Sequence, residues 1–120
     1  MITDETKSLL ATYLESIILS GQIGLGGNST SPASTTLDVP LTVTVSKVSD
    51  KTSQNVVQVK LEILGSAIAG KVIREVGLFD HATPASGDLL QRMNFSGVGP
   101  FSSSERLQIY LTMEIEWNGK

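Results

Sequence analysis

The sequence lacks cysteine altogether and contains a single histidine, His81. The missing cysteines exclude disulfides and thiolate metal sites. No apolar run approaches the ~18 residues that a membrane-spanning helix requires. The first residues are acidic where a signal peptide would be basic, so we expect a protein that is made in a cytoplasm and carries no export signal.

Charged and aromatic residues are also scarce. Charged residues form 18% of the chain and aromatic residues 5%, whereas an average soluble domain has roughly 25% charged residues. The low charge indicates that neighbouring proteins cover part of the surface. The formal net charge of -3 argues against binding to nucleic acid or to an anionic membrane.

An amphipathic pattern over residues 3–20 predicts one N-terminal helix within residues 1–21. Thr3 can act as the N-cap, and acidic residues follow in the first turn, where the helix dipole favours them. Gly21 suits the position after the helix end. Five apolar residues share the spacing of one helical stripe: Leu10, Tyr13, Leu14, Ile17 and Ile18. This stripe either packs on the chain's own sheet or forms an interface with a neighbouring subunit.

Residues 22–37 are rich in glycine, serine, threonine and proline, which predicts a loop. Gly24, Gly26 and Gly27 lie at its start, and no Lys-Ser/Thr pair follows them as it would in a phosphate-binding loop. We therefore interpret them as glycines of a flexible loop. Loops of this length are uncommon inside a domain and are often functional, and we expect this one to become ordered on assembly.

Alternating apolar and polar residues predict strands throughout residues 38–117. Strands at 39–45 and 57–63, joined by a polar turn at 49–53, form the first predicted hairpin. Two further strands are expected at 71–79 and 89–95.

The last predicted strand has the clearest pattern of all. Its apolar residues face one way and its polar residues the other: Leu107, Ile109, Leu111, Met113, Ile115 and Trp117 alternate with Gln108, Tyr110, Thr112, Glu114 and Glu116. The whole pattern predicts one β-rich (α+β) domain over residues 1–120. It consists of the N-terminal helix followed by an antiparallel β-sandwich or a helix-covered sheet of about five or six strands.

Residues suited to catalysis are few. His81 lies in a turn-like stretch, and its spacing from Asp80 and Asp88 matches no known metal-ligand pattern. We therefore expect no catalytic residue, no metal and no cofactor.

Arg74 and Glu75 are adjacent charges within an apolar strand, and consecutive strand residues point to opposite faces. A charge among apolar neighbours needs a partner. The two residues are either rim charges at the sheet edge, or members of an ion pair within the sheet or between subunits that fixes the register.

Residues 72–80 read Val-Ile-Arg-Glu-Val-Gly-Leu-Phe-Asp. This stretch resembles the (I/V)-x-E-(I/V)-G-L-F-D signature of phage tail-fibre and tail-collar proteins. The continuation at 87–92 and 106–117, and the earlier segments 24–26 and 31–37, are similar to further segments of such small virion proteins. The resemblance covers about residues 21–117.

This resemblance implies a β-rich adaptor that is mounted on a phage tail or baseplate in several symmetric copies. It assigns structural roles to the signature residues, with Gly77 allowing close backbone approach and Phe79 filling the core. Those residues are Arg74, Glu75, Gly77, Leu78, Phe79 and Asp80. Tail fibres continue into a shaft and a tip, whereas this chain ends at Lys120, so we expect a mount, an adaptor ring or a related subunit.

The function expected from the sequence is therefore that of a non-enzymatic structural subunit in a virion. We expect a homo-oligomer, either a trimer or a hexameric ring, bound to other virion structural proteins and to neither nucleic acid nor membrane. Two alternatives stay open. One is a capsid decoration or head–tail joining protein. The other is a receptor- or carbohydrate-binding module, which would need exposed aromatic residues such as Tyr110.

Overall fold

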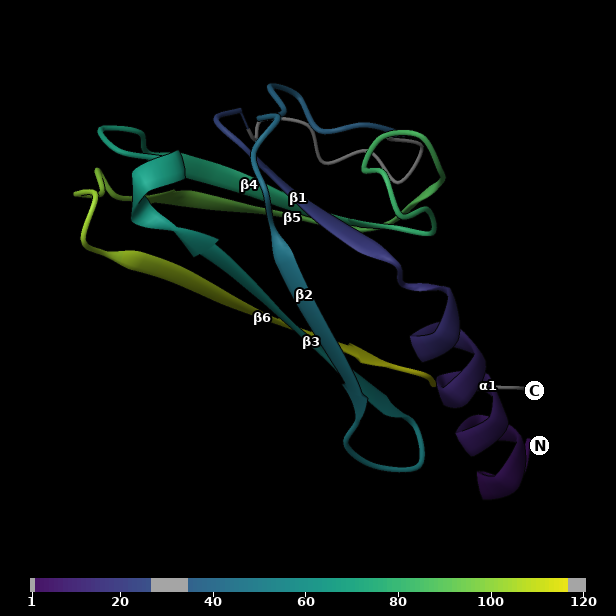
Figure 1. The fold of residues 1–120 in the computed structure, drawn as a ribbon. Helices are drawn as coiled ribbons and strands as arrows, with labels where there is room; N and C mark the ends of the chain where they lie inside the picture. The colour runs from purple at the N-terminus through teal and green to yellow at the C-terminus, as the bar shows by residue number, and fades with distance from the viewer. Residues whose placement is uncertain (1, 27–34, 117–120) are drawn as a thin grey trace.

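The computed structural model describes residues 2–26 and 35–116, which form one N-terminal helix and two three-stranded antiparallel sheets (Figure 1). The elements follow one another as α1 (Asp4–Ile17), β1 (Ser20–Gly24), β2 (Ser46–Lys51), β3 (Val56–Leu64), the short 3-10 helix η1 (Gly65–Ala67), β4 (Ile73–Phe79), β5 (Leu89–Val98) and β6 (Arg106–Glu114). One sheet has the strand order β1-β4-β5 and the other β2-β3-β6. The predicted β-rich class is confirmed, and the arrangement is sandwich-like.

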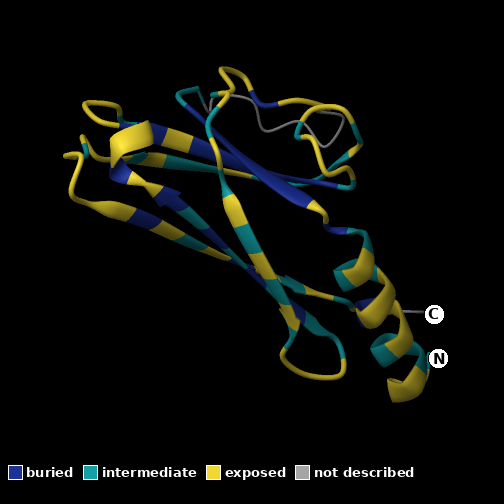
Figure 2. Ribbon diagram, in the orientation of Figure 1, coloured by how far each residue is buried: buried dark blue, intermediate teal, exposed yellow. Residues whose placement is uncertain are grey.

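The hydrophobic core lies between the two sheets. Every second residue of β3 from Val57 to Ile63 is buried, and the apolar side chains of β6 lie directly opposite in register. Ile23 and Leu78 join the same core from the other sheet. Full burial of such an aliphatic side chain contributes about 1.5–3 kcal/mol. Figure 2 shows the buried residues concentrated on the strands.

The predicted alternation of the last strand is confirmed for residues 107–115. Leu107 and Leu111 are buried, and the polar residues between them are exposed. Trp117 lies outside the described residues.

The predicted helix forms with Thr3 as its N-cap, and the Thr3 side chain accepts a hydrogen bond from Thr6 N. The predicted buried stripe is wrong in part. Ala11 and Ile18 are buried and Leu14 packs on the core, but Leu10 and Tyr13 are exposed and Ile17 is partly buried. The apolar residues cover more than one face of the helix, and the helix packs on the core through Ala11 and Leu14.

The helix is shorter than predicted, and the segment after it was predicted wrongly. Residues 20–24 form strand β1, which pairs with β4 from Ser20↔Phe79 to Gly24↔Glu75. Gly21 is therefore a strand residue paired with Leu78, and it packs closely on the core, since a Cβ there would lie 2.5 Å from Leu61 Cδ2. The central part of the predicted loop, residues 27–34, lies outside the described residues.

The predicted hairpin exists, but its first strand is shifted along the chain. Strand β2 occupies residues 46–51, which include most of the predicted polar turn, and it pairs with β3 in the register Ser46↔Glu62. The polar residues are tolerated because β2 is an edge strand whose lysines reach helix α1: Lys51 Nζ lies 2.8 Å from Ser8 Oγ, and Lys47 Nζ donates to the Ile18 carbonyl.

Residues 41–45 alternate in burial as predicted, but Val39 is exposed and the segment 39–45 forms no regular strand. Leu41, Val43 and Val45 pack partly buried against the core. The segment crosses from one sheet to the other, so it makes only local bonds to β1, such as Leu41 N to Ile23 O at 2.9 Å. The strands predicted at 71–79 and 89–95 are present as β4 and β5.

Candidate functional site

The β1-β4-β5 sheet has a second covered face, turned away from the β2-β3-β6 sheet. Residues 35–41 and the loop 80–88 lie over this outer face (Figure 1). Gly24, Glu75, Gly77 and Phe79 are all fully or nearly buried there. Of the stretch that resembles tail proteins, Glu75, Gly77 and Phe79 lie on this face, whereas Val76 and Leu78 belong to the main core.

Glu75 lies at the centre of the outer face with no exposed surface. Oε1 accepts hydrogen bonds from Asp38 N at 2.7 Å and from Arg92 Nη2 at 3.1 Å. Oε2 accepts from Val39 N at 2.7 Å and from Gly26 N at 2.9 Å. A buried carboxylate is tolerated because its charge is compensated by hydrogen bonds and an ion pair.

These four bonds occupy all the acceptor positions of the Glu75 carboxylate, because an ionised carboxylate has about four lone-pair sites on two oxygens. A general base needs a lone pair that can reach a substrate proton. Glu75 in this arrangement has none to offer, so its geometry is that of a structural anchor. The anchor holds both Gly26 and the Asp38–Val39 peptide to strand β4.

Arg92 extends the anchor from strand β5. Its Nη2 forms ion pairs with Glu75 Oε1 at 3.1 Å and Asp38 Oδ2 at 2.9 Å, and its Nη1 donates to the Thr36 carbonyl at 3.2 Å. Its side chain is 10% exposed. A planar guanidinium suits this task because its donors have a fixed fork geometry. The segment that contains Thr36 and Asp38 is therefore attached to both β4 and β5.

Two glycines make room for the anchor. A Cβ on Gly24 would collide with Glu75 Oε2 and lie 2.6 Å from the Val39 carbonyl oxygen. A Cβ on Gly26 would lie 2.6 Å from Asp38 Cβ and 3.0 Å from Glu75 Oε2. The interpretation of these residues as flexible-loop glycines is therefore wrong: they permit close packing around a carboxylate. Gly27 lies outside the described residues.

The rest of the signature also has defined positions. Phe79 is fully buried on the outer face, and Gly77 makes space because its Cβ would lie 2.9 Å from Leu89 Cδ1 and 3.1 Å from Leu37 Cδ2. Leu78 points to the main core. Asp80 closes the loop 80–88, with Oδ1 accepting from Asp88 N at 2.6 Å.

The adjacent charges Arg74 and Glu75 differ completely in environment. Glu75 is the buried member of an ion pair within the sheet, but its partner is Arg92 rather than a residue of its own strand. Arg74 is exposed and forms no ion pair with any residue in the described part of the chain.

His81 is exposed, and its Nδ1 accepts a hydrogen bond from Thr83 N at 3.0 Å, which stabilises the loop. Within residues 2–26 and 35–116, no cluster of histidine, aspartate or glutamate has the arrangement of a metal site. None of the described helices is long and apolar enough to span a bilayer.

Polar atoms without partners also occur on the outer face. Ser20 and Gln22 of β1 are 7% and 6% exposed, and neither Ser20 Oγ nor Gln22 Oε1 has a hydrogen-bond partner among the described residues. An unsatisfied buried polar atom costs about 1–3 kcal/mol. The outer face is thus more polar than the main core.

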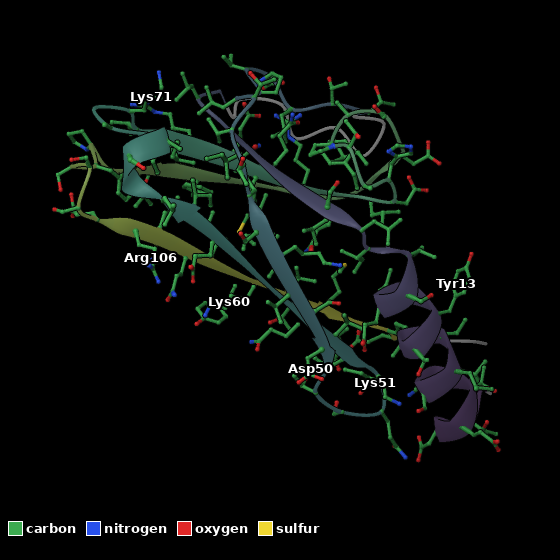
Figure 3. The ribbon with its side chains drawn as sticks, viewed as in Figure 1. Tyr13, Asp50, Lys51, Lys60, Lys71 and Arg106 are labelled. Carbon is green, nitrogen blue, oxygen red and sulfur yellow. The ribbon has the colours of Figure 1, made fainter. Side chains whose placement is uncertain are left out.

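The predicted interface residues of the helix are only partly available to a partner. Leu9 and Tyr13 are each 65% exposed and Leu10 is 44% exposed, whereas Ile18 is fully buried. Figure 3 shows Tyr13 projecting from the helix away from the sheets. A partner could therefore reach the face formed by Leu9, Leu10 and Tyr13.

The described surface has a groove whose lining contains few groups that could bind a ligand. One of about 630 Å³ lies between residues 42–46 and the end of β3 and contains no aromatic residue. Its one carboxylate, Glu62, is already bonded to Arg106 and Gln108. The groove therefore lacks the stacking surface that a sugar site uses.

Glu75 stands out in the sequence as a charge within an apolar strand. Its contacts with Asp38, Arg92 and the glycines are not predicted by the sequence. The available signal was the presence of an acid and a base on predicted neighbouring strands, since a buried acid needs a partner. The backbone N–H donors leave no trace in the side-chain pattern. No protein-family model matches the chain, and no curated protein matches it either.

Proposed function

We propose that this chain is a non-enzymatic structural subunit of a tailed-phage virion, acting as a tail, baseplate or tail-fibre adaptor. It binds other virion structural proteins in several symmetric copies, as a trimer or a hexameric ring, and it uses no cofactor. It is made in the host cytoplasm and incorporated into the particle.

The observation that carries the proposal is that the Glu75 carboxylate is fully engaged in hydrogen bonds within the protein. The most conspicuous acid of the tail-protein signature has all four acceptor positions filled by Gly26, Asp38, Val39 and Arg92. All the hydrogen-bonding capacity of this carboxylate is used to hold a surface segment to the sheet. This favours a role in which a rigid frame presents a surface over a role in which the signature reacts with a substrate.

Exposed apolar side chains provide a second line of support. Leu9, Leu10 and Tyr13 lie together on helix α1 and are 44–65% exposed. Contiguous exposed apolar residues commonly mark contacts with other proteins. We assign this helix face to contacts within the assembled particle.

The test is to locate the chain in particles. Antibodies raised against the purified chain are used to probe density-gradient fractions from a culture that produces it, and gold-labelled antibody is imaged on the particles. We expect the chain to co-fractionate with intact particles and the label to lie at the tail.

Copy number, measured by quantitative mass spectrometry of the same fractions, completes the test. A small multiple of three or six copies supports the tail adaptor. Hundreds of copies with label over the shell would replace it with a capsid decoration protein. Absence of the chain from purified particles would overturn the proposal.

A further inference from the structure

The four edge strands of the two sheets differ in how their unpaired backbone groups are protected. The outer edge of β1 is covered by residues 39–41, through bonds from Leu25 N to Val39 O and from Leu41 N to Ile23 O, both 2.9 Å. Strand β5 is irregular, with register shifts at both ends and Gly97 at a φ of +121°. Such bulges discourage pairing with another strand.

Strand β2 is protected in a different way. It has six residues, three of them charged. Lys51 bonds to Ser8 of helix α1, and Lys47 donates to the carbonyl of Ile18, the C-cap residue of that helix. Short edge strands with charged residues resist pairing with another chain.

Strand β6 has none of these protections. Its nine residues pair with β3 without a register shift, and no charged residue or proline lies between Arg106 and Glu114. In the described part of the chain, no strand pairs with its other edge. A long, regular and uncharged edge is the kind that accepts a further strand.

The backbone groups that point outward from β6 can be identified. Ile115 N donates to Asn55 O and Gly65 N donates to Glu105 O, both at 2.8 Å, so the odd-numbered residues of this segment face β3. Because the pattern alternates along an antiparallel strand, the even-numbered residues direct their N–H and C=O groups to the open edge. The central ones are Gln108, Tyr110 and Thr112.

We propose that β6 pairs antiparallel with β6 of a second copy of this chain, about a two-fold axis at Tyr110. This register uses the whole strand and joins outward groups with outward groups. It also makes the side chains complementary. On the exposed face, Arg106 lies opposite Glu114 of the second copy and Gln108 opposite its Thr112, while the two Tyr110 side chains meet at the axis.

The other face of the strand is equally complementary. In this register Leu107 lies opposite Met113 of the second copy, and Ile109 opposite its Leu111. Ile109 and Met113 pack against the core but remain partly exposed at the open edge. Pairing removes this apolar surface from water and extends the three-stranded sheet to six strands across two copies.

Charge and the length of β6 together favour this register over its neighbours. In the register shifted by two residues in one direction, Arg106 lies opposite Glu116, which is beyond the end of β6, and Glu114 lies opposite Gln108. In the register shifted by two residues the other way, Arg106 lies opposite Thr112 of the second copy and Glu114 lies opposite its Ser104, so no opposite charges meet. The proposed register gives two symmetric Arg–Glu pairs, and opposite charges directly across a sheet are mutually stabilising. Arg106 projects from the outer side of its sheet, where it can also contact Glu62 (Figure 3).

This inference goes beyond the proposed virion role, since a two-fold strand contact gives a dimer whether or not the chain belongs to a particle. A trimer or ring would need another interface in addition. A negative result for either proposal therefore leaves the other standing.

The experiment uses two single variants, Arg106→Glu and Glu114→Arg, in sedimentation velocity over a range of concentrations. The wild type should form a dimer. Each variant places like charges opposite each other twice, so its dimer dissociation constant should rise about tenfold or more. Mixed together, the two variants restore both opposite-charge pairs and should form a heterodimer.

The outcomes decide the proposal in both directions. A heterodimer from the mixture, with neither variant dimerising alone, establishes the register. A wild type that stays monomeric at every concentration overturns it, as does a mixture that associates no better than its components. Circular dichroism of each variant verifies folding.

A second measurement does not depend on charge. Because the chain has no cysteine, Tyr110→Cys introduces a single thiol at the proposed axis. Mild oxidation should give a disulfide-linked dimer. The matched control is Val48→Cys on β2, a residue that is 64% exposed. Equal cross-linking of both variants would contradict the β6 contact.

Discussion

The inner face of the β1-β4-β5 sheet packs aliphatic side chains such as Ile23 and Leu78 against the second sheet, whereas the outer face packs the Glu75 carboxylate against backbone N–H groups. Apolar contacts have little directional preference, so the inner face can adjust when a side chain changes. Hydrogen bonds have strict geometry, so the outer face depends on a few atoms at fixed positions. The same sheet therefore combines a tolerant face and an exacting one.

The apolar core that the inner face shares with the β2-β3-β6 sheet is disrupted most completely by a buried charge. Leu111→Asp places a carboxylate among apolar side chains that leave Leu111 no exposure, and such a group has no compensating partner. We expect loss of cooperative thermal unfolding, measured by circular dichroism. Val48→Asp, at an exposed position of β2, is the control and should melt normally. Native-like melting of Leu111→Asp would contradict the assignment of this strand.

The outer face is disrupted by replacing a single carboxylate oxygen with an amide nitrogen. Glu75→Gln keeps the shape but puts an NH2 donor where backbone donors already point. It also leaves Arg92 without one ion-pair partner. We expect a loss of about 3–5 kcal/mol in the free energy of unfolding, measured by urea titration.

The neighbouring residue provides the control for that measurement. Arg74→Gln removes an exposed charge from the same strand and should change stability by less than about 0.5 kcal/mol. Equal stability of Glu75→Gln and the wild type would show that the carboxylate is not the anchor.

Substitutions of two glycines in β1 allow the inner and outer faces to be compared directly, because Gly21 faces the core and Gly24 faces the anchor. In Gly24→Ala the new methyl group meets the Val39 carbonyl and the anchored carboxylate, whereas in Gly21→Ala it meets the end of the Leu61 side chain, which can rotate. We expect costs of about 3 and about 1 kcal/mol respectively, within the range for overpacking. Urea titration of both variants tests the order, and the reverse order would refute the contrast between the faces.

The smallest effect concerns the loop over the outer face. Asp80→Ala removes the acceptor for Asp88 N and should cost about 1 kcal/mol, the typical net contribution of one hydrogen bond. Asp50→Ala, at an exposed position of β2, should cost less than about 0.5 kcal/mol. Indistinguishable melting temperatures for the two variants would mean that the loop does not depend on this bond.

The sequence predicts the apolar core between the two sheets well and the outer face of the β1-β4-β5 sheet poorly. Period-two alternation identifies β3 and β6 because burial of Val59 or Leu111 depends only on side-chain type. The anchor depends on the N–H groups of residues 26, 38 and 39, which every residue type except proline carries. No side-chain pattern distinguishes those positions.

The other errors have a similar origin. Strand β1 contains Ser20, Gly21, Gln22 and Gly24, a composition typical of a loop, and it is a strand because β4 and the overlying chain bury it on both faces. Helix α1 begins where its capping residue predicts, since capping is local, whereas its buried face depends on the distant β2 and β3. Features set by neighbouring residues, such as the helix cap, are therefore predicted correctly, whereas features set by distant contacts, such as strand β1 and the buried face of the helix, are not.

Glu75 accepts hydrogen bonds from both Gly26 and Val39, so the two ends of the intervening chain meet at a single side chain. Residues 36–38, just before the second of these ends, are also held to the sheet, through Arg92 and the burial of Leu37. Since each doubling of a closed loop costs only about 0.6 kcal/mol in chain entropy, we expect foreign peptides inserted between Gly26 and Thr36 to be accepted. The protein could therefore serve as a display scaffold in which one buried carboxylate closes the graft at its base.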